Sequence, residues 1–315
     1  MDSATVYDCV VIGGGPAGYA AALYAVRASL DTLVVEQGMP GGQIATSDIV
    51  DNYPGIPDVT GAELGTKMQQ HAESAGAKSA YGMVSALKRD EDGLFTVVTD
   101  MDTYRARSVI VATGATPRPG GFAGEGTFRG RGVSYCATCD AMFYRGKRVF
   151  VIGGGNSACE EALYLANVAS SVEMVVRRDA FRAPRGMVDR VLANKKITVR
   201  YQTSIIAVEG ERFIERIDFR DNASGSEHAE AFEPGSVGVF VFAGNNPVTA
   251  LVQPYVDLGP DGGVLTDESM ATRTPGLYCA GDMRTKALRQ VVTAAADGAI
   301  AGNAAYRYVE EHYRS

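Results

Sequence analysis

Two cysteines separated by two residues, Cys136 and Cys139, have the clearest chemistry in this chain. Such a pair can close a small disulfide ring without long-range rearrangement, and one of its thiols is usually prepared for exchange. Half of a zinc site is one alternative, but a structural zinc ion needs four ligands, and the chain offers no second cysteine pair. Two inert thiols are the other alternative. The spacing therefore predicts a redox-active disulfide and no metal site.

Asp140 directly follows Cys139 and is the candidate proton donor and acceptor for the pair. Thiol–disulfide exchange moves a proton at each turn, and a carboxyl group can carry it. Asp is also a preferred helix N-cap, and both roles are compatible at one position. The three histidines lie scattered without a motif around them, so no Ser–His–Asp or Cys–His arrangement is expected.

Two glycine-rich turns, at residues 13–18 and 153–158, each stand between an apolar strand and a helix. In such turns the glycines let backbone N–H groups approach a pyrophosphate at a helix N-terminus. One turn of this kind is weak evidence, but two in a complete βαβ context are strong evidence for two dinucleotide sites. The expected strands are 9–12 with 32–35 and 149–152 with 172–176, and the expected helices are about 17–28 and 157–167.

An acidic residue marks the first nucleotide site. Glu36 ends the second strand of the first unit, where a carboxylate accepts hydrogen bonds from the ribose hydroxyls. A negative charge there repels a 2′-phosphate. The first site therefore suits FAD or NAD.

Arginines mark the second site. At the corresponding strand end Val176 is followed by Arg177 and Arg178, with Arg182 one turn later. Arginine forks bind phosphate bidentately, so this cluster favours the 2′-phosphate of NADPH, although a solvated basic face is the plain alternative. Two nucleotide sites and a dithiol in one chain indicate electron transfer from one nucleotide, through the other, to a disulfide.

Bulk composition limits the class of protein. The chain has 315 residues, 46 % hydrophobic and 21 % charged, and a formal net charge of −7. These values are typical of a globular protein, and the acidic balance argues against nucleic acid or an anionic membrane as a partner. No secretory signal or membrane span is expected from the sequence. Five cysteines do not form a secreted disulfide framework, and Cys9, Cys159 and Cys279 are expected to be buried thiols, so we expect a cytoplasmic protein.

The order of the elements predicts an α/β fold of two doubly wound, Rossmann-like dinucleotide-binding domains, the second inserted in the first. A strand near residues 276–282 and a helix from about 289 to 308 have no nucleotide turn of their own and are expected to complete the first sheet. Gly- and Pro-rich segments at 114–120 and 244–247 read as the two linkers. The expected domains are 1–117 with 247–315, which binds FAD, and 118–246, which binds NADPH and carries the dithiol.

Nearly end to end, the chain resembles the low-molecular-weight, bacterial-type, NADPH-dependent thioredoxin reductases. The most specific part of the resemblance is the pentapeptide 136–140 in its place before the second glycine turn. The other segments that carry it are 13–18, 40–43, 52–55, 112–114, 177–178 with Arg182, 280–282 and 289–291.

The resemblance implies roles for individual residues. Cys139 would face the flavin, Cys136 would be the interchange thiol that attacks the partner's disulfide, and Asp140 would be the acid–base residue. Asp282 would bind ribityl or phosphate-side hydroxyls of FAD, and Gln290 would contact the isoalloxazine. The implied FAD residues are Gly13, Gly15, Pro16, Ala17, Gly18, Glu36, Gly41, Gly42, Gln43, Asn52, Ala112, Thr113, Gly114, Gly281, Asp282, Arg289, Gln290 and Val291. The implied NADPH residues are Gly153, Gly155, Asn156, Ser157, Ala158, Arg177, Arg178 and Arg182.

The family is homodimeric, with FAD bound non-covalently, and its partner is thioredoxin. Two positions depart from its pattern. Val176 stands where the family usually has a histidine, and Ala141, Met142 and Phe143 stand where it usually has a glycine and two phenylalanines. The second segment helps to dock thioredoxin, so the expected partner is thioredoxin or a similar small dithiol protein.

The implied activity is a thioredoxin-disulfide reductase. Because the dithiol and the nicotinamide site share one domain and must both meet one flavin, we expect that domain to rotate about the two linkers. Four alternatives stay open at this point. They are a flavin-dependent dithiol oxidase, a thioredoxin reductase with a non-NADPH donor, a peroxiredoxin-reducing relative, and a flavin-binding scaffold or sensor.

Overall fold

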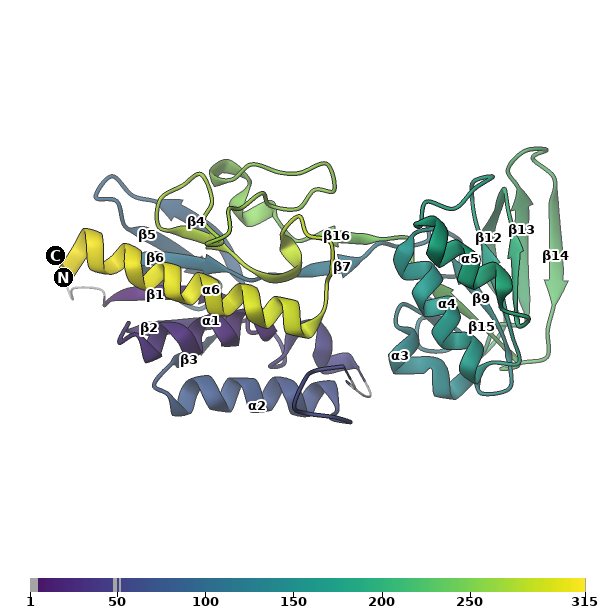
Figure 1. Cartoon of the computed structure of the whole chain (residues 1–315), viewed down its shortest axis with the longest axis horizontal. Helices are drawn as coiled ribbons and strands as arrows, with labels where there is room; N and C mark the ends of the chain where they lie inside the picture. The colour runs from purple at the N-terminus through teal and green to yellow at the C-terminus, as the bar shows by residue number, and fades with distance from the viewer. Residues whose placement is uncertain (1–4, 48–49, 51, 315) are drawn as a thin grey trace. The chain divides into compact units, whose positions relative to one another are not determined.

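The structure is a computed structural model that describes residues 5–47, 50 and 52–314, without the side chains of Thr46, Thr138 and Cys139. The expectation that the N-terminus carries no secretory signal falls partly outside these residues. The chain divides into two compact units (Figure 1). Unit 1 comprises Met1–Thr116 with Asn246–Ser315, and unit 2 comprises Pro117–Asn245.

Unit 1 is built on a seven-stranded sheet of order β3-β2-β1-β6-β5-β4, with β17 also pairing with β6. The pairs β1–β2, β1–β6, β2–β3 and β6–β17 are parallel, whereas β4 and β5 are antiparallel. The predicted strand near residue 278 therefore does complete the first sheet. The strands are β1 (Val6–Ile12), β2 (Thr32–Glu36), β3 (Lys78–Tyr81), β4 (Val84–Arg89), β5 (Phe95–Thr99), β6 (Thr103–Val111) and β17 (Leu277–Cys279).

Apolar residues run continuously along β1 because both faces of the sheet are covered. Cys9 and Val11 belong to a core beneath the helices, and Val10 and Ile12 belong to a second core on the opposite face. Helices α1 and α6 lie side by side on one face (Figure 1). The helices of unit 1 are α1 (Pro16–Arg27), α2 (Gly61–Ser74), α6 (Val291–Val309), the 3₁₀ segments η1 (Gly42–Thr46), η3 (Ala250–Tyr255) and η4 (Gly281–Met283), and the π-helical end η5 (Glu310–Arg314).

Unit 2 has a five-stranded parallel sheet of order β11-β10-β9-β15-β8 and a separate antiparallel sheet β12-β13-β14. Its strands are β8 (Val133–Ser134), β9 (Arg148–Ile152), β10 (Ser171–Val175), β11 (Ile197–Arg200), β12 (Thr203–Glu209), β13 (Arg216–Asp221), β14 (Glu227–Ala231) and β15 (Val237–Val241). Its helices are α3 (Ala137–Asp140), η2 (Ala141–Tyr144), α4 (Asn156–Val168) and α5 (Arg185–Ala193).

The two linkers pair as a short ribbon of β7 (Ala115–Pro117) and β16 (Asn245–Pro247). Pro117 groups with unit 2 and Asn246 with unit 1, one residue from the boundaries expected. Ribbon pairing holds each crossing in an extended form although both linkers are rich in glycine and proline.

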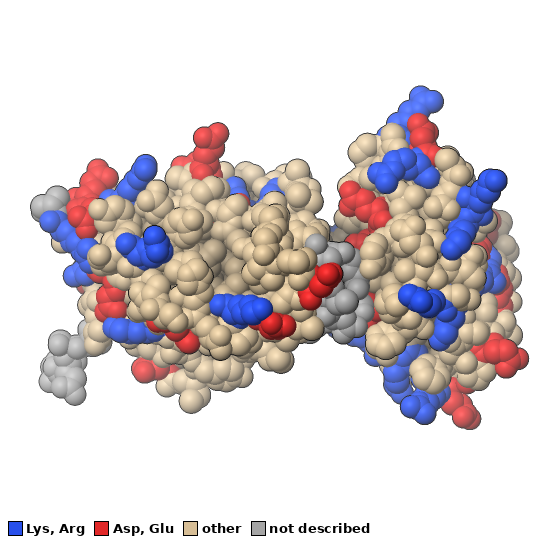
Figure 2. Space-filling model, turned by 60° about the horizontal axis from the view of Figure 1, so that its bottom comes forward, with Lys and Arg blue, Asp and Glu red and all other residues tan. Residues whose placement is uncertain are grey.

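Cys9, Cys159 and Cys279 are buried free thiols, as predicted. Burial raises the pKa of Cys159 to about 11 and that of Cys9 to about 12, so neither is a reactive thiolate at neutral pH. No helix in the described part of the chain is long and apolar enough to span a membrane. Figure 2 shows acidic and basic side chains interspersed over the visible face.

Candidate functional site

The first glycine turn brings β1, α1 and β6 into close contact. A Cβ on Gly18 would lie 1.8 Å from the carbonyl oxygen of Gly13, and a Cβ on Gly13 would lie 2.5 Å from that of Ala112. Gly15 is different, because the nearest atom to its Cβ position is the Gly41 carbonyl oxygen at 3.8 Å. The turn is thus closed against the sheet and open at the start of α1, where Pro16 and Ala17 follow. This is the arrangement that lets a pyrophosphate approach backbone N–H groups.

Glu36, at the end of β2, faces the turn. Its carboxylate accepts hydrogen bonds from the backbone N–H groups of Gly14 and, at 2.7 Å, of Gly38. A carboxylate held beside the glycine turn is placed to recognise ribose hydroxyls.

A loop at the start of η1 lies against the same turn. Gly41 donates its N–H to the Gly14 carbonyl at 2.8 Å. Gln43 Nε2 donates to the carbonyl of Ala115 at 2.5 Å, which ties the loop to the segment that follows Ala112, Thr113 and Gly114.

Asn52 and Gln290 are 238 residues apart in sequence and meet in the fold, with Asn52 Nδ2 donating to Gln290 Oε1 at 2.9 Å. Gln290 is the N-cap of α6 and forms a reciprocal capping box with Thr293. Val291 packs against the small core around Leu64. The N-terminus of α6 and the 52–55 segment thereby form one wall of the site.

Asp282 lies in η4, and its buried Oδ1 atom has no hydrogen-bond partner among the residues that the structure describes. Burial raises the pKa of this carboxyl above its ordinary value, and the charges of Lys286 and Arg289 oppose that rise. Arg289 Nε donates to the Asp282 carbonyl at 3.2 Å, and its Nη2 reaches Asp261 at 3.0 Å. A buried acceptor without a donor can accept a hydrogen bond from a ligand hydroxyl.

The second glycine turn is in unit 2. Gly153 has φ = +141°, and a Cβ there would lie 2.6 Å from the Phe242 carbonyl oxygen and 2.7 Å from the Ala158 Cβ. Alanine fits the third position because Ala158 packs into the core beneath α4. Gly155 is the N-cap, and Asn156 and the exposed Ser157 open the helix.

Arg177, Arg178 and Arg182 are all exposed beside this turn. Arg182 donates its backbone N–H to the Gly154 carbonyl at 2.7 Å, which fixes the start of its side chain above the turn. Within the described residues none of the three guanidinium groups has a carboxylate partner. Val176, in contrast, is buried and packs over Gly154.

Cys136 is disulfide-bonded, and its pairing with Cys139 stays a prediction because the latter's side chain is not described. Ser134 holds the start of the motif, because its Oγ accepts the Cys136 N–H and donates to the Cys136 carbonyl, both at 3.1 Å. The Asp140 N–H donates to the same carbonyl at 3.2 Å. This closes α3 as a single turn.

Asp140 is at the N-cap position of η2, but its side chain makes no capping hydrogen bond. Its carboxyl group is therefore not engaged in the role that was the alternative to proton transfer. Burial of Tyr144 and the nearby charge of Asp140 together raise the pKa of Tyr144 to about 12. Met142 and Phe143 follow with 56 % and 66 % of their surfaces exposed. The segment after the dithiol thus presents two large apolar side chains to solvent.

Comparison with known proteins identifies relatives of this chain. Residues 7–298 match the family described as pyridine nucleotide-disulphide oxidoreductase. The chain is 41 % identical over 309 residues to a thioredoxin reductase of Listeria monocytogenes (97 % of this chain, 95 % of the relative) and 40 % identical over 315 residues to one of Bacillus subtilis (99 % and 97 %). The chain belongs to the low-molecular-weight thioredoxin reductases.

Solved structures of thioredoxin reductases have the same fold. The Lactococcus lactis enzyme, in a structure described as its FR conformation, superposes with a TM-score of 0.79 at 38 % identity and covers 97 % of this chain and 99 % of its own. The Streptococcus pyogenes enzyme gives 0.77 at 40 % identity, with 98 % and 100 % covered. Membership in this family makes the chain a flavoprotein oxidoreductase and implies a flavin and a pyridine nucleotide.

The residues of unit 1 fit a bound flavin nucleotide by two independent observations. The open backbone at Gly15 leaves room for a pyrophosphate, and the buried Asp282 Oδ1 lacks a donor that a sugar-alcohol hydroxyl would supply. Both features lie in the same compact unit as Glu36.

Sequence reasoning missed a buried carboxylate next to the dithiol motif. Glu125 accepts the Tyr135 hydroxyl at 2.5 Å and the N–H groups of Gly120 and Gly121 at 2.6 and 2.8 Å. Burial and this bond raise the pKa of Tyr135 to about 12. The carboxylate joins the end of the first linker to the residue before Cys136. The only sequence feature that could have pointed to this carboxylate is Tyr135, a residue with a hydrogen-bonding hydroxyl directly before the dithiol motif.

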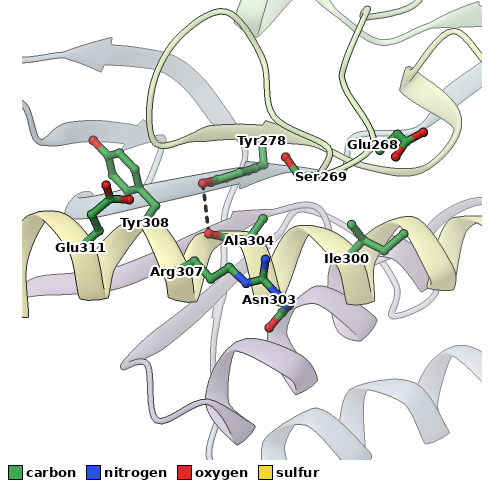
Figure 3. A pocket seen from close by; sticks show the side chains of 9 residues that line it. All are labelled: Glu268, Ser269, Tyr278, Ile300, Asn303, Ala304, Arg307, Tyr308 and Glu311. Carbon is green, nitrogen blue, oxygen red and sulfur yellow. Dashed lines mark hydrogen bonds between the residues drawn. The ribbon is translucent and has the colours of Figure 1, made fainter.

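Unit 1 also carries a hollow of about 470 Å³ between α6 and the segment that holds Glu268 and Ser269 (Figure 3). Tyr278, whose hydroxyl donates to the Ala304 carbonyl at 3.2 Å, forms its floor with Arg307 and Tyr308 nearby. None of the predicted site residues lines it.

Proposed function

We propose that this chain moves electrons from NADPH, through FAD and the Cys136–Cys139 disulfide, to oxidised thioredoxin or a similar small dithiol protein. The observation that carries the proposal is the disulfide-bonded Cys136 in the same compact unit as a glycine turn with three exposed arginines, none of which has a carboxylate partner in the described part of the chain.

FAD would be held in unit 1 by the first glycine turn, Glu36, the η1 loop, Asp282 and the N-terminus of α6. When bound, it supplies a two-electron relay between nicotinamide and disulfide. The chain's own contribution is to bind and orient this group. The helix N-termini of α1 and α6 favour its negatively charged parts.

NADPH would bind at the second glycine turn, with Arg177, Arg178 and Arg182 around the 2′-phosphate. Because these guanidinium groups have no carboxylate partner within the described residues, no ion pair has to break when a phosphate arrives. Gly155, Asn156 and Ser157 would bring backbone N–H groups at the start of α4 to the pyrophosphate.

Exchange with the partner needs two thiolates that act in turn and one proton carrier. The Cys136 thiolate attacks a sulfur of the partner's disulfide, forming a mixed disulfide and releasing the partner's other sulfur as a thiolate. The Cys139 thiolate then attacks the Cys136 sulfur, which restores the Cys136–Cys139 disulfide and releases the reduced partner. Asp140 would give up and take back the protons that the departing thiolates need.

We further propose a cytoplasmic homodimer whose unit 2 turns about the two linkers during the cycle. Buried free cysteines, typical of a reducing compartment, support the location. The proposed chemistry supports the rotation. The nicotinamide and the dithiol would both belong to unit 2, and each must reach the same flavin in turn.

The test is an anaerobic titration of the FAD-loaded protein with NADPH or NADH, followed at the flavin absorption band. NADPH alone should bleach the band rapidly, and oxidised thioredoxin should restore it. If NADPH fails and a reduced dithiol bleaches the flavin, the chain is a dithiol oxidase or uses another donor. The exposed arginines at the second turn, which have no carboxylate partner among the described residues, favour NADPH over those alternatives.

A further inference from the structure

A buried carboxylate holds the residue that precedes the dithiol motif. Glu125 is 7 % exposed, and its Oε1 atom accepts the Tyr135 hydroxyl at 2.5 Å and the Gly120 N–H at 2.6 Å. Its Oε2 atom accepts the Gly121 N–H at 2.8 Å. Because the pKa of Tyr135 is raised to about 12, its hydroxyl stays protonated at neutral pH and remains a donor. Both carboxylate oxygens are therefore engaged, one of them by the neighbour of Cys136.

A tight loop returns the chain to this carboxylate. The Val133 N–H donates to the Phe128 carbonyl at 2.9 Å, which brings the start of β8 back beside the segment that holds Glu125. Arg129, in the same loop, places its guanidinium group over the Tyr135 ring, 5.0 Å from the ring centroid. The Tyr135 ring is thus held at its hydroxyl by a carboxylate and on its face by a cation.

Cys136 has anchored neighbours on both sides. Ser134 belongs to β8, which pairs with β15 in the sheet, and its hydroxyl bonds both the N–H and the carbonyl of Cys136 at 3.1 Å. Ala137, on the other side, is fully buried in the core that also contains α4. Tyr135 adds a third anchor, because it reaches Glu125 in a segment outside the sheet.

We propose that Glu125 and Tyr135 are positioning residues that keep Cys136 in place while its disulfide is open. The proposal rests on the redox role proposed above for the Cys136–Cys139 pair. In the closed form the disulfide itself fixes Cys136 against its partner. In the open dithiol that constraint is lost, and the hydrogen bond between Glu125 and Tyr135 limits how far the Cys136 backbone moves away.

The consequence is a high effective concentration of the second thiol at Cys136. Groups held in place form a bond more favourably than groups that are free to separate. Fixing the backbone of one residue changes an equilibrium constant by about tenfold. Loss of the hydrogen bond should therefore favour the dithiol over the disulfide by about tenfold, which raises the reduction potential of the pair by about 30 mV. A contact that stabilises both forms equally would leave this potential unchanged.

The experiment equilibrates the full-length, FAD-loaded protein with glutathione buffers, anaerobically and without NADPH. Two glutathione thiols give two electrons and two protons to the disulfide, which yields the dithiol and one glutathione disulfide. Acid quenching, alkylation and mass spectrometry of the peptide that carries the motif give the reduced fraction at each glutathione ratio.

Tyr135→Phe should shift the midpoint of this titration by about tenfold toward the dithiol, because it removes the hydroxyl and keeps the ring. Tyr81→Phe is the matched control, since Tyr81 is a 71 % exposed tyrosine in unit 1, and its midpoint should equal that of the wild type. A Tyr135→Phe midpoint equal to that of the control would overturn the inference. Near-ultraviolet circular dichroism checks folding, and Glu125→Gln, read against the wild type, replaces Tyr135→Phe if that variant does not fold.

A double-mutant cycle separates positioning from the charge of the carboxylate. Glu125→Gln alone should also shift the midpoint toward the dithiol, but in the Tyr135→Phe background it should add less than about twofold, because the hydrogen bond is already absent. Equal shifts in both backgrounds would reveal an electrostatic effect of the carboxylate on the sulfur atoms and would overturn the inference. A wild-type disulfide that glutathione does not reduce at any ratio would instead overturn the proposed redox role, and the inference with it.

Discussion

Single substitutions in the arginine cluster beside the second glycine turn can test whether these residues discriminate between NADPH and NADH. Replacing Arg177, Arg178 or Arg182 with alanine removes one guanidinium group that is exposed and has no carboxylate partner within the described residues. Each variant should raise KM for NADPH and leave KM for NADH unchanged, because only NADPH carries the 2′-phosphate.

The size of the effect follows from exposure. A hydrogen bond between charged groups contributes about 1.5–3 kcal/mol, and solvent screening at an exposed site favours the lower end. A loss of about 1.5 kcal/mol corresponds to about a tenfold increase in KM. The main-chain N–H of Arg182 is bound to the Gly154 carbonyl, so this side chain starts from a fixed point and should have an effect at least as large as the other two.

Steady-state reduction of thioredoxin, with NADPH and NADH in parallel, gives both constants. Arg220→Ala is the matched control, because Arg220 is an exposed arginine already paired with Glu227 at 2.7 Å. The effect on NADPH should shrink at high ionic strength, where the exposed charges are screened. Equal increases in KM for both nucleotides would refute the reasoning, since the arginines would then contact a part that NADH shares.

Three further substitutions test other parts of the structure. Gly18→Ala places a Cβ 1.8 Å from a carbonyl oxygen of the turn and should abolish co-purification of flavin, whereas Gly126→Ala, in open space, should not; flavin retained by both would contradict the packing. Tyr135→Phe removes a hydrogen bond to the buried Glu125 carboxylate and should lower the free energy of unfolding by about 1.5–3 kcal/mol in denaturant titrations. Unchanged unfolding would show that this contact does not form. Burial and a neighbouring carboxylate raise the pKa of Glu161 to about 7 from an ordinary 4.5, so the folded chain holds a proton that the unfolded chain releases between these values. Its stability contribution therefore falls as pH rises from 4.5 to 7 and stays low above, and Glu161→Gln should be more stable by up to about 3 kcal/mol at pH 8 with a flatter profile. Identical pH profiles of thermal unfolding for both proteins would contradict it.

The two βαβ units could be predicted from sequence because each is set by local patterns. The predicted helix near 157–167 is α4 with one residue added at each end, and the predicted strand 172–176 is β10 shifted by one. The long C-terminal helix begins at Val291 rather than Arg289 because Gln290 has extended dihedral angles and caps it. The antiparallel strands β12 to β14 were not predicted individually, since the pairing partner of a strand is decided by tertiary contacts.

The candidate site also has a part that local sequence patterns predict and a part that depends on contacts between distant segments. Glycine turns and the charge at the following strand end are local, so their residues alone indicate two nucleotide sites of opposite preference. The contact between Asn52 and Gln290 is not local, and only the family resemblance brought these residues into one list. Val176 shows the limit of such transfer, because its side chain is buried over Gly154 and takes no part in the exposed arginine cluster.

Buried charges were beyond the reach of the sequence for a physical reason. Asp297 reads as one polar residue on a mostly small-residue helix, and Glu125 reads as an acid in a glycine-rich segment. A buried carboxylate is tolerated only where donors converge on it, and those donors come from loops distant in sequence or from backbone N–H groups that no side-chain pattern records. Asp297 collects Gly281, Arg284 and Lys286, and Glu125 collects Gly120, Gly121 and Tyr135. Asp297 binds Gly281, the residue before Asp282, and Glu125 binds Tyr135, the residue before Cys136. Each carboxylate therefore holds the neighbour of a residue that is predicted to take part in the chemistry. Candidate ligand-binding residues can therefore be proposed from motifs, whereas the carboxylates that hold the neighbours of those residues in place are found only in the folded structure.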